Sequence, residues 1–220
     1  MLRLKEIFFI RHGRQCSKRC NVDVELDEVG RSQAALAAER LAGYGIEVLY
    51  SSGLKRAVET AEIIGGRLGL VPVIIEEFRE IDFGTMTGKD DARILKEYAD
   101  FREQRAAQIS DLAYPGGENG ADVVKRALPQ LERICGGAQE RVAVVSHGGV
   151  IRSLCAYLLE TDLKNKLKFA VDLENTSFTQ ISYDEKKGLY YLERFNDFAH
   201  LENYPELLRK SWKASWIRKG

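Results

Sequence analysis

The first apolar run of the chain, Ile7–Ile10, constrains the fold more than any other stretch. It is short, continuous and rich in β-branched and aromatic residues, and it leads directly into Arg11, His12 and Gly13. Such a run predicts a strand buried on both faces, which is typical of a parallel sheet. Because ligands bind at the carboxyl edge of open α/β sheets, a guanidinium beside an imidazole here indicates an anion site. We expect the neighbouring glycine to let a ligand approach the backbone.

The next segments alternate between helix and strand. The pattern predicts a helix that begins after the cap residue Asp27, a strand at 46–50, a helix over 54–64 and a strand at 71–75. Together with the first strand, this order is β-α-β-α-β. It is the signature of a parallel sheet with right-handed crossovers.

The first strand has a counterpart later in the chain, the apolar run Val142–Val145, which ends in Ser-His-Gly-Gly with the histidine at His147. A helix is expected from Val150. Residues 176–183 and 189–195 alternate in polarity around a turn, which predicts an antiparallel hairpin at the sheet edge. The predicted fold class is therefore α/β, with three layers: a mostly parallel central sheet and helices on both faces.

The region at about 76–139 interrupts the alternation of strand and helix. It contains charged helical sequence, a turn rich in glycine and a further helix over 121–135. Because no linker flanks it, we interpret it as a helical insertion over the carboxyl edge of a single domain spanning 1–220.

Composition limits the partners of the chain. Lys plus Arg and Asp plus Glu both number 33 among 220 residues, which argues against nucleic-acid or membrane partners held by bulk charge. No apolar run reaches the roughly 18 residues of a membrane-spanning helix. The amino end lacks the apolar core of a signal peptide, and the four cysteines are scattered, so we expect a cytoplasmic protein with reduced thiols. In the tail at about 197–220, Trp212 and Trp216 suit packing or a subunit contact, which leaves a homodimer open.

Two histidines that end two buried strands admit two chemical interpretations. Both can bind a metal, or one can attack phosphorus while the other holds phosphate oxygens. Arg11 adjoins His12, and Arg56 is predicted on the first turn of the second helix, facing the same edge. Since cations repel a divalent metal but neutralise a phosphoryl group, phosphate is the better interpretation. The spacing of His12, Cys16 and Cys20 lacks the fourth ligand of a structural zinc site.

Four motifs, in this order and at these separations, resemble those of the histidine phosphatase superfamily in its phosphoglycerate-mutase-like branch. They are Arg11-His12-Gly13, Ser51–Ala57 with Glu59–Ala61, Glu80–Gly84 and Ser146–Val150. The resemblance covers roughly residues 6–183. An Arg-His-Gly tripeptide alone is a weak signal, whereas the four motifs together are specific.

The resemblance implies a phosphohistidine mechanism that needs no metal or other cofactor. His12 would attack the phosphoryl group, and Glu80 would protonate the leaving oxygen and then activate water. The groups implied to hold the phosphoryl oxygens are Arg11, Arg56, His147 and the amide of Gly148. Elementary chemistry agrees, because a neutral imidazole must attack and the neighbouring guanidiniums favour that neutral form.

The sequence departs from the family pattern in two places. The family has an Asn a few residues after its first motif that touches phosphate, whereas here Lys18 stands at that offset and Asn21 lies later. We assign the contact to Asn21, with Lys18 or Ser17 as alternatives. Phosphoglycerate mutases carry an Arg directly after the acid and an Arg pair in the insertion. Here Ile81 follows Glu80 and no Arg-Arg pair occurs, which favours a phosphatase.

Two further features have a plain structural explanation beside a functional one. His200 lies between Ala199 and Leu201 and is expected to be structural or at the surface. The loop at 115–119 could cradle phosphate, but it lacks the Lys-Ser/Thr ending of a P-loop, so a turn before a helix is the alternative. By resemblance the loop borders the mouth of the site, which makes Glu118 a candidate pocket residue.

We therefore predict an enzyme that hydrolyses a small phosphorylated metabolite through a phosphohistidine on His12. Specificity is assigned to residues 14–21, 85–118 and 175–178. One rival is a phosphoglycerate-type mutase, which differs from a phosphatase by excluding water. The other is a non-catalytic phospho-ligand-binding protein, which the complete set of His, Arg and Glu residues disfavours.

Overall fold

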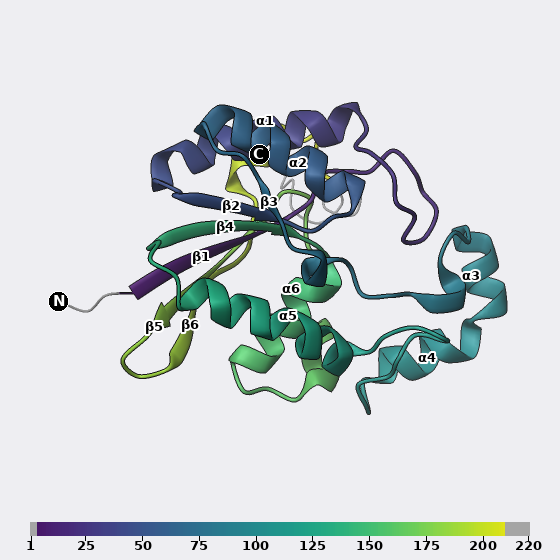
Figure 1. The fold of residues 1–220 in the computed structure, drawn as a ribbon. Coiled ribbons are helices and arrows are strands. Elements are labelled where there is room, and N and C mark those ends of the chain that lie inside the picture. The colour runs from purple at the N-terminus through teal and green to yellow at the C-terminus, as the bar shows by residue number, and fades with distance from the viewer. Residues whose placement is uncertain (1–3, 210–220) are drawn as a thin grey trace, which may run out of the picture.

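A computed structural model describes residues 4–209 of the chain. Its centre is a six-stranded sheet between two layers of helices (Figure 1). The strand order is β3-β2-β4-β1-β5-β6, with the first four parallel and the last two antiparallel to their neighbours. The strand bounds are β1 Leu4–Arg11, β2 Val48–Ser51, β3 Val73–Ile74, β4 Arg141–Ser146, β5 Phe178–Asp184 and β6 Leu189–Asp197. The mostly parallel sheet and its hairpin edge confirm the predicted fold class.

Helices cover both faces of this sheet and extend beyond its carboxyl edge (Figure 1). One face carries α1 and α2, the other carries α5 and α6, and α3 and α4 lie past the strand ends. The helix bounds are α1 Glu28–Leu41, α2 Lys55–Leu68, α3 Asp91–Glu97, α4 Ala99–Ala107, α5 Gly120–Cys135 and α6 Gly148–Leu158. Short 3₁₀ turns occur at η1 Ala42–Tyr44, η2 Glu76–Phe78, η3 Gly84–Met86, η4 Leu163–Lys168 and η5 Ala199–Leu201.

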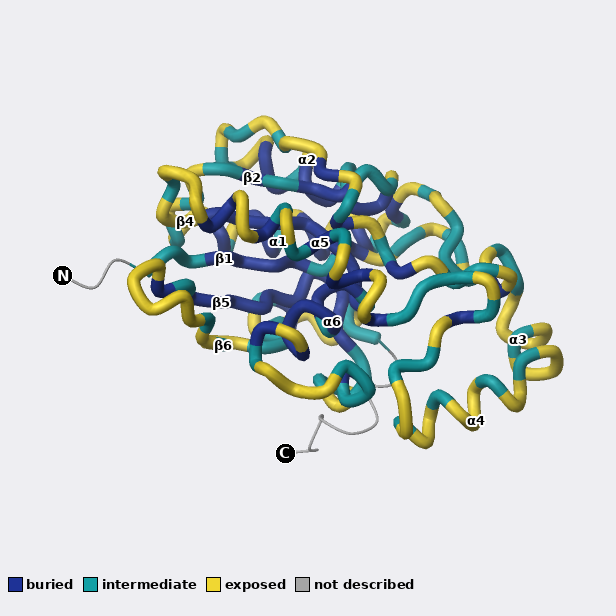
Figure 2. Tube along the Cα trace, turned by 60° about the horizontal axis from the view of Figure 1, so that its bottom comes forward, coloured by how far each residue is buried: buried dark blue, intermediate teal, exposed yellow. Residues whose placement is uncertain are grey.

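The first strand is buried on both faces, as its continuous apolar sequence predicts. Ile7 and Phe9 pack in the core under α5 and α6, whereas Phe8 and Ile10 pack in the core under α1 and α2. All four side chains are fully buried, and the central strands lie in the dark interior of Figure 2. Burial of this size anchors β1 in the middle of the molecule and holds the residues at its carboxyl end in place.

The parallel pairing of β1 with β4 brings the two histidine motifs together. In this register Ile10 lies opposite Val145, and Arg11 lies opposite Ser146. The residues that follow the two strands, His12 and His147, therefore leave the sheet side by side, as predicted.

Helix α1 begins as its sequence indicates. The Asp27 side chain accepts a hydrogen bond from the amide of Gly30 at 2.8 Å, which is an N-cap contact. After the helix and the η1 turn, Gly45 adopts a positive φ of 64°, which turns the chain toward β2.

Two details of the fold differ from the sequence prediction. Strand β3 is reduced to Val73–Ile74 at the exposed edge, where only one neighbour is available for pairing. The predicted insertion at 76–139 lies only partly over the carboxyl edge, because α5 has an apolar stripe and packs on the sheet face beside α6. Trp212 and Trp216 lie outside the described residues.

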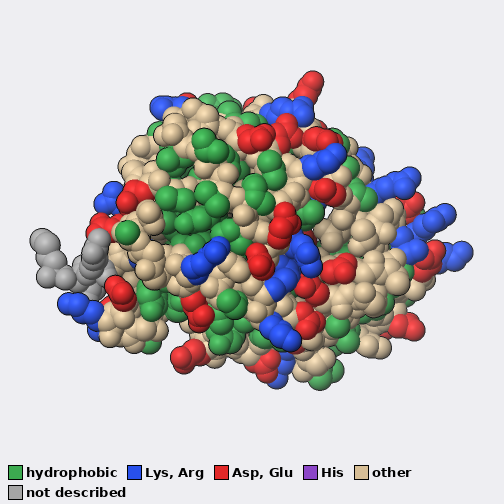
Figure 3. Space-filling model, in the orientation of Figure 1, with side chains coloured by type: hydrophobic (Ala, Val, Ile, Leu, Met, Phe, Trp, Pro, Cys, Tyr) green, Lys and Arg blue, Asp and Glu red, His purple; other side chains and the backbone are tan. Residues whose placement is uncertain are grey.

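The surface drawn in Figure 3 mixes charges of both signs. Lysine and arginine side chains are interspersed with aspartate and glutamate on this face, in keeping with the formal net charge of zero. None of the helices within residues 4–209 combines the length and the apolar character that a transmembrane span requires.

Candidate active site

His12 and His147 form the centre of the site. Both side chains are buried, and their ring centroids lie 5.0 Å apart. His147 also precedes the first residue of α6, so the amide of Gly148 belongs to the first turn of that helix. The unsatisfied N–H groups and the dipole of a helix N-terminus favour an anion at this point.

The hydrogen bonds of His12 determine which ring nitrogen carries the proton. Its Nδ1 lies 2.7 Å from the carbonyl oxygen of Gly13, which can only accept, so Nδ1 holds the proton. Nε2 therefore keeps its lone pair, toward which Nε of Arg56 donates at 3.2 Å. Burial, followed by the nearby charge of Arg56, lowers the pKa of His12 to about 3. The imidazole is therefore neutral at physiological pH.

His147 is oriented by Ser52, a residue that the sequence analysis did not single out. The Ser52 hydroxyl lies 2.7 Å from Nε2 of His147. Nδ1 of the same ring is buried and has no hydrogen-bond partner within residues 4–209. Burial, with the charges of Arg56 and His12, lowers the pKa of His147 well below its usual value. A hydroxyl can donate or accept, and we assign the donor role to Ser52 because Nδ1–H of His147 then faces the site as a donor for an anion.

Arg56 is held in place by the loop after the first motif. Its Nη1 donates to the carbonyl of Val22 at 2.9 Å, and its Nη2 donates to Oδ1 of Asn21 at 3.1 Å. Asn21 in turn donates from Nδ2 to the carbonyl of Ile81 at 3.2 Å. The structure thus brings the predicted residue Asn21 to the site as a partner of Arg56, while Lys18 is exposed on the wall of the same cavity.

Arg11 presents a second buried donor. Its Nη1 donates to the carbonyl of Leu173, whereas its Nε is buried without a partner in the described part of the chain. Buried polar atoms without partners are rare in folded proteins, so each one calls for an explanation. Two such atoms, in Arg11 and His147, lie beside the unprotonated Nε2 of His12. A tetrahedral oxyanion would complete this arrangement.

Glu80 lies over the same cavity. Its Oε1 accepts hydrogen bonds from the amides of Ile81 and Gly149, both at 2.9 Å. Burial raises the pKa of Glu80, although these hydrogen bonds and the charge of Arg56 oppose the rise. A carboxyl group with a raised pKa retains its proton to higher pH and can act as an acid.

Two expectations are corrected by the structure. Glu118 is not among the residues that line the cavity, because it pairs with Arg126 at 2.8 Å and accepts from the amide of Asp82 at 2.9 Å. Its loop is the turn before a helix, with Asn119 capping α5. Gly13 makes room for α1 rather than for a ligand, since a Cβ there would lie 2.6 Å from the carbonyl oxygen of Gly30.

The cavity itself has two lobes. One, of about 810 Å³, is lined by His12, Arg56 and the loop at 14–21. The other, of about 570 Å³, lies toward α6 and η4. Five side chains line both lobes: Arg11, Glu80, Phe83, Asp91 and Arg209.

Sequence reasoning missed Arg209, a cavity residue from the end of the described part of the chain. Asn175 donates from Nδ2 to the carbonyl of His12 at 2.8 Å, and Arg209 packs beside it. Asn175 falls in the stretch 175–178 assigned to specificity, but no sequence pattern marks Arg209. Ser52 could have been found, because it directly follows the second strand within one of the four motifs.

Metal ligands do not gather at this site. Within residues 4–209, no three His, Cys, Asp or Glu side chains form a cluster that could hold a metal ion. The spacing of His12, Cys16 and Cys20 therefore makes no such cluster. The donors described above are those of an anion site.

Comparisons with known proteins agree with this geometry. A phosphoglycerate mutase-like protein 4 of Arabidopsis thaliana is 39% identical over 162 residues, covering 68% of this chain and 69% of the relative. A glucosyl-3-phosphoglycerate phosphatase of Mycobacterium tuberculosis is 34% identical over 197 residues, covering 82% of this chain and 86% of the relative.

Similarity extends to solved structures and to a family model. The native structure of a mycobacterial glucosyl-3-phosphoglycerate phosphatase matches with a TM-score of 0.80 and 30% identity, covering 89% of this chain and all 100% of that one. The family model of the histidine phosphatase superfamily (branch 1) matches residues 7–197. Motifs, fold and site geometry lead to one conclusion: the chain belongs to the histidine phosphatase superfamily, branch 1.

Proposed function

We propose that the protein hydrolyses a small phosphomonoester through a phosphohistidine on Nε2 of His12. The observation that supports this most strongly is the pair of unpartnered buried donors beside that nitrogen, Nε of Arg11 and Nδ1 of His147. Together with Arg56, which already contacts His12, they provide positive charge and N–H groups for the three equatorial oxygens of a phosphoryl group. Such preorganised donors usually lower the activation barrier more than any other catalytic effect.

In the first step, the lone pair of Nε2 of His12 forms a bond to phosphorus while the bond from phosphorus to the leaving oxygen breaks. Glu80 gives its proton to that oxygen. The hydrogen bond from Nδ1 of His12 to Gly13 keeps the proton off the attacking nitrogen and balances the positive charge that develops on the ring.

In the second step, water attacks phosphorus and gives a proton to the Glu80 carboxylate. The bond from nitrogen to phosphorus breaks, and its electrons return to Nε2 of His12. Orthophosphate leaves from the donors of Arg11, Arg56, His147 and the Gly148 amide. Asn21 contributes by holding Arg56, and no metal takes part in either step.

The test is a panel of phosphomonoesters assayed for phosphate release with a chelator present. We expect hydrolysis by the wild type and a loss of at least about 10³-fold in kcat for His12→Ala, because the nucleophile is removed. Rapid quenching at alkaline pH should trap phosphate on the wild-type protein but not on the variant. His200→Gln is the matched control, since His200 is bound to Thr176 and stacks on Phe178. Full activity of a folded His12→Ala would refute the mechanism.

The same panel of phosphomonoesters distinguishes the proposed phosphatase from its two alternatives, a mutase and a non-catalytic binding protein. Isomerisation of a phosphoglycerate without phosphate release would identify a mutase, in keeping with the name of the plant relative. The absence of an arginine after Glu80, where Ile81 is buried instead, favours the phosphatase. Binding of phosphate without turnover of any ester would identify a non-catalytic binding protein.

We further propose a reducing, cytoplasmic setting for a single-domain enzyme. Cys16, Cys20, Cys135 and Cys155 are all free thiols, which suits a compartment that keeps cysteines reduced. A homodimer remains a prediction, for which the exposed side chains of Val73 and Ile74 on the edge strand β3 offer an apolar contact surface.

A further inference from the structure

The second lobe of the cavity is too large to serve the phosphoryl group alone. It measures about 570 Å³, which is within the range of sites that hold a whole small molecule. It joins the His12 lobe along a shared boundary that includes Arg11 and Glu80. Because Glu80 would protonate the leaving oxygen, the lobe beyond it is where the leaving group lies.

Positive side chains surround this lobe, but most of them are already engaged. Arg152 donates to the carbonyls of Phe169, Ala170 and Val171. Lys166 pairs with Asp111, and Arg11 donates to Leu173. The carbonyl contacts fix the positions of Arg152 and Arg11 without removing their charge, whereas Asp111 neutralises Lys166. Arg105, the other arginine of this lobe besides Arg209, lies over the ring of Tyr114.

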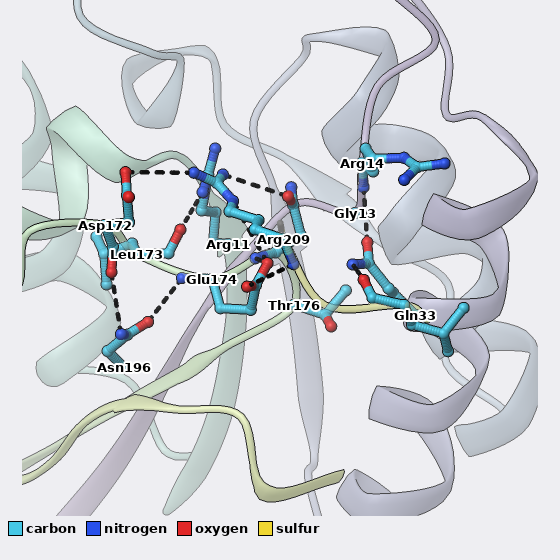
Figure 4. A network of polar contacts seen from close by, with 12 residues as sticks. Arg11, Gly13, Arg14, Gln33, Asp172, Leu173, Glu174, Thr176, Asn196 and Arg209 are labelled. Carbon is cyan, nitrogen blue, oxygen red and sulfur yellow. Dashed lines mark hydrogen bonds and ion pairs between the residues drawn. The ribbon is translucent and has the colours of Figure 1, made fainter. Parts of the chain in front are cut away.

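Arg209 lines both lobes and belongs to neither the sheet nor the helices. It is the last residue of the described chain, and its side chain lies beside Arg11 and Glu174 (Figure 4). The segment is attached to α1 by Gln33, whose Nε2 donates to the carbonyl of Leu207 at 2.8 Å. The amide of Arg209 donates to Oε2 of Glu174 at 3.3 Å. These anchors hold the guanidinium at the junction of the two lobes.

The contacts of the guanidinium itself are long. Its Nε lies 3.4 Å from Glu174, its Nη1 lies 3.5 Å from Asp172, and its Nη2 donates to Asn175 at 3.3 Å. A charge-assisted N–H···O bond is normally about 2.7–2.9 Å long. The Asp172 side chain is 42% exposed, and burial raises the pKa of Glu174 to about 7, so neither acid neutralises Arg209 fully.

We propose that Arg209 binds a carboxylate on the leaving group of the substrate, which makes it the residue that selects carboxylated phosphomonoesters. This inference rests on the proposed function, because it presumes that a phosphomonoester occupies the His12 lobe. A guanidinium matches the planar, two-oxygen geometry of a carboxylate and can bind it with two hydrogen bonds. Its place on both lobes puts this contact next to the phosphoryl site.

The test compares two probes that differ in one group, 3-phosphoglycerate and glycerol 3-phosphate, in which a carboxylate is replaced by a hydroxymethyl group. We expect wild-type kcat/KM to favour 3-phosphoglycerate by at least about tenfold, the value of one charge-assisted contact. Arg209→Gln should bring that ratio close to one, through a higher KM for 3-phosphoglycerate. Arg209→Lys should keep an intermediate preference, since lysine retains the positive charge but lacks the planar guanidinium that binds both carboxylate oxygens.

The matched control is Arg67→Gln, which removes an arginine whose exposed ion pair with Glu39 lies at the end of α2. It should keep the wild-type ratio, and thermal melting checks that each variant folds. A purely structural role of Arg209 would lower kcat for both probes alike instead of changing the ratio. An unchanged ratio in folded Arg209→Gln, or a wild-type ratio near one, would overturn the assignment while leaving the phosphatase proposal intact. No phosphate release from any ester would overturn both.

Discussion

At the scale of single residues, the site is organised by one hydrogen bond to each histidine, which leaves the other ring nitrogen facing the site. Gly13 holds the proton on Nδ1 of His12, and Ser52 occupies Nε2 of His147. The two rings thereby take opposite roles, one as a lone-pair donor and the other as an N–H donor. Burial lowers the pKa of both rings, which keeps them neutral so that these roles persist at physiological pH.

Replacing Ser52 with alanine tests this arrangement. The change leaves Nε2 of His147 without its partner, so the proton can move to Nε2 and turn an acceptor toward the phosphoryl oxygens. Losing one buried hydrogen bond costs about 1–3 kcal/mol, so we expect kcat/KM to fall by roughly 10- to 100-fold. Inhibition by orthophosphate should weaken in parallel, which reports on the donor directly.

Ser51→Ala is the control for this prediction. Ser51 is equally buried, but its hydroxyl donates to the backbone carbonyl of Ser52 rather than to a histidine. We expect less than a threefold change in phosphate inhibition for Ser51→Ala. Equal effects of the two variants would mean that Ser52 acts through packing alone.

At the scale of elements, strand ends and helix starts bring the charged groups together. Strands β1 and β4 end in the two histidines, α2 presents Arg56 in its first turn, and α6 begins beside the site. The contact between the loop after β1 and helix α1 is especially tight, because Gly13 and Gly30 face each other without side chains.

Gly30→Ala should destabilise the protein even though alanine favours helix. A Cβ at this position would lie 2.1 Å from the carbonyl oxygen of Arg14, so the loop that carries His12 has to move. We expect the free energy of unfolding to fall by about 2 kcal/mol, with reduced activity, as measured by denaturant titration and phosphate release. Gly66→Ala is the matched control, since nothing lies within 4 Å of its Cβ position in α2. It should raise the free energy of unfolding by up to about 1 kcal/mol, and a stabilised Gly30→Ala would refute the close-contact explanation.

At the scale of the whole molecule, the site is complete only when residues from both ends of the described chain come together. The first strand supplies Arg11 and His12, and the last described residues supply Arg209, which contacts Asn175 beneath the His12 loop. An anion bound here should therefore stabilise the entire fold, because it binds groups that unfolding separates.

Orthophosphate should accordingly raise the melting temperature. At ten times its dissociation constant, a ligand adds about 1.4 kcal/mol of stability, or roughly 3–5 °C for a protein of this size. We expect this shift with a chelator present, measured by thermal denaturation against sodium chloride of equal ionic strength. His147→Phe should lose most of it, because a phenyl ring fills the same space but has no N–H donor. An equal shift in that variant would place the anion elsewhere.

Much of this arrangement can be predicted from short patterns in the chain. The continuous apolar runs at β1 and β4 predict buried parallel strands, and Asp27 predicts the start of α1. The histidines and arginines at the ends of these elements were identified from their position and their resemblance to one family. The edge strand β3 and the loop with Glu118 were predicted less well, because pairing at an edge and the partner of a surface carboxylate depend on what lies nearby.

The sequence by itself determined the strands, the helices and the chemical character of their ends, because burial and capping act over a few residues. Only the tertiary structure decided that Ser52 orients His147, 95 residues away, and that Arg209 returns to the cavity. It also decided that Gly13 accommodates α1 and that Glu118 pairs with Arg126. The physical reason is that each of these contacts joins segments brought together by chain folding, and no local pattern of side chains records which distant partner will be there.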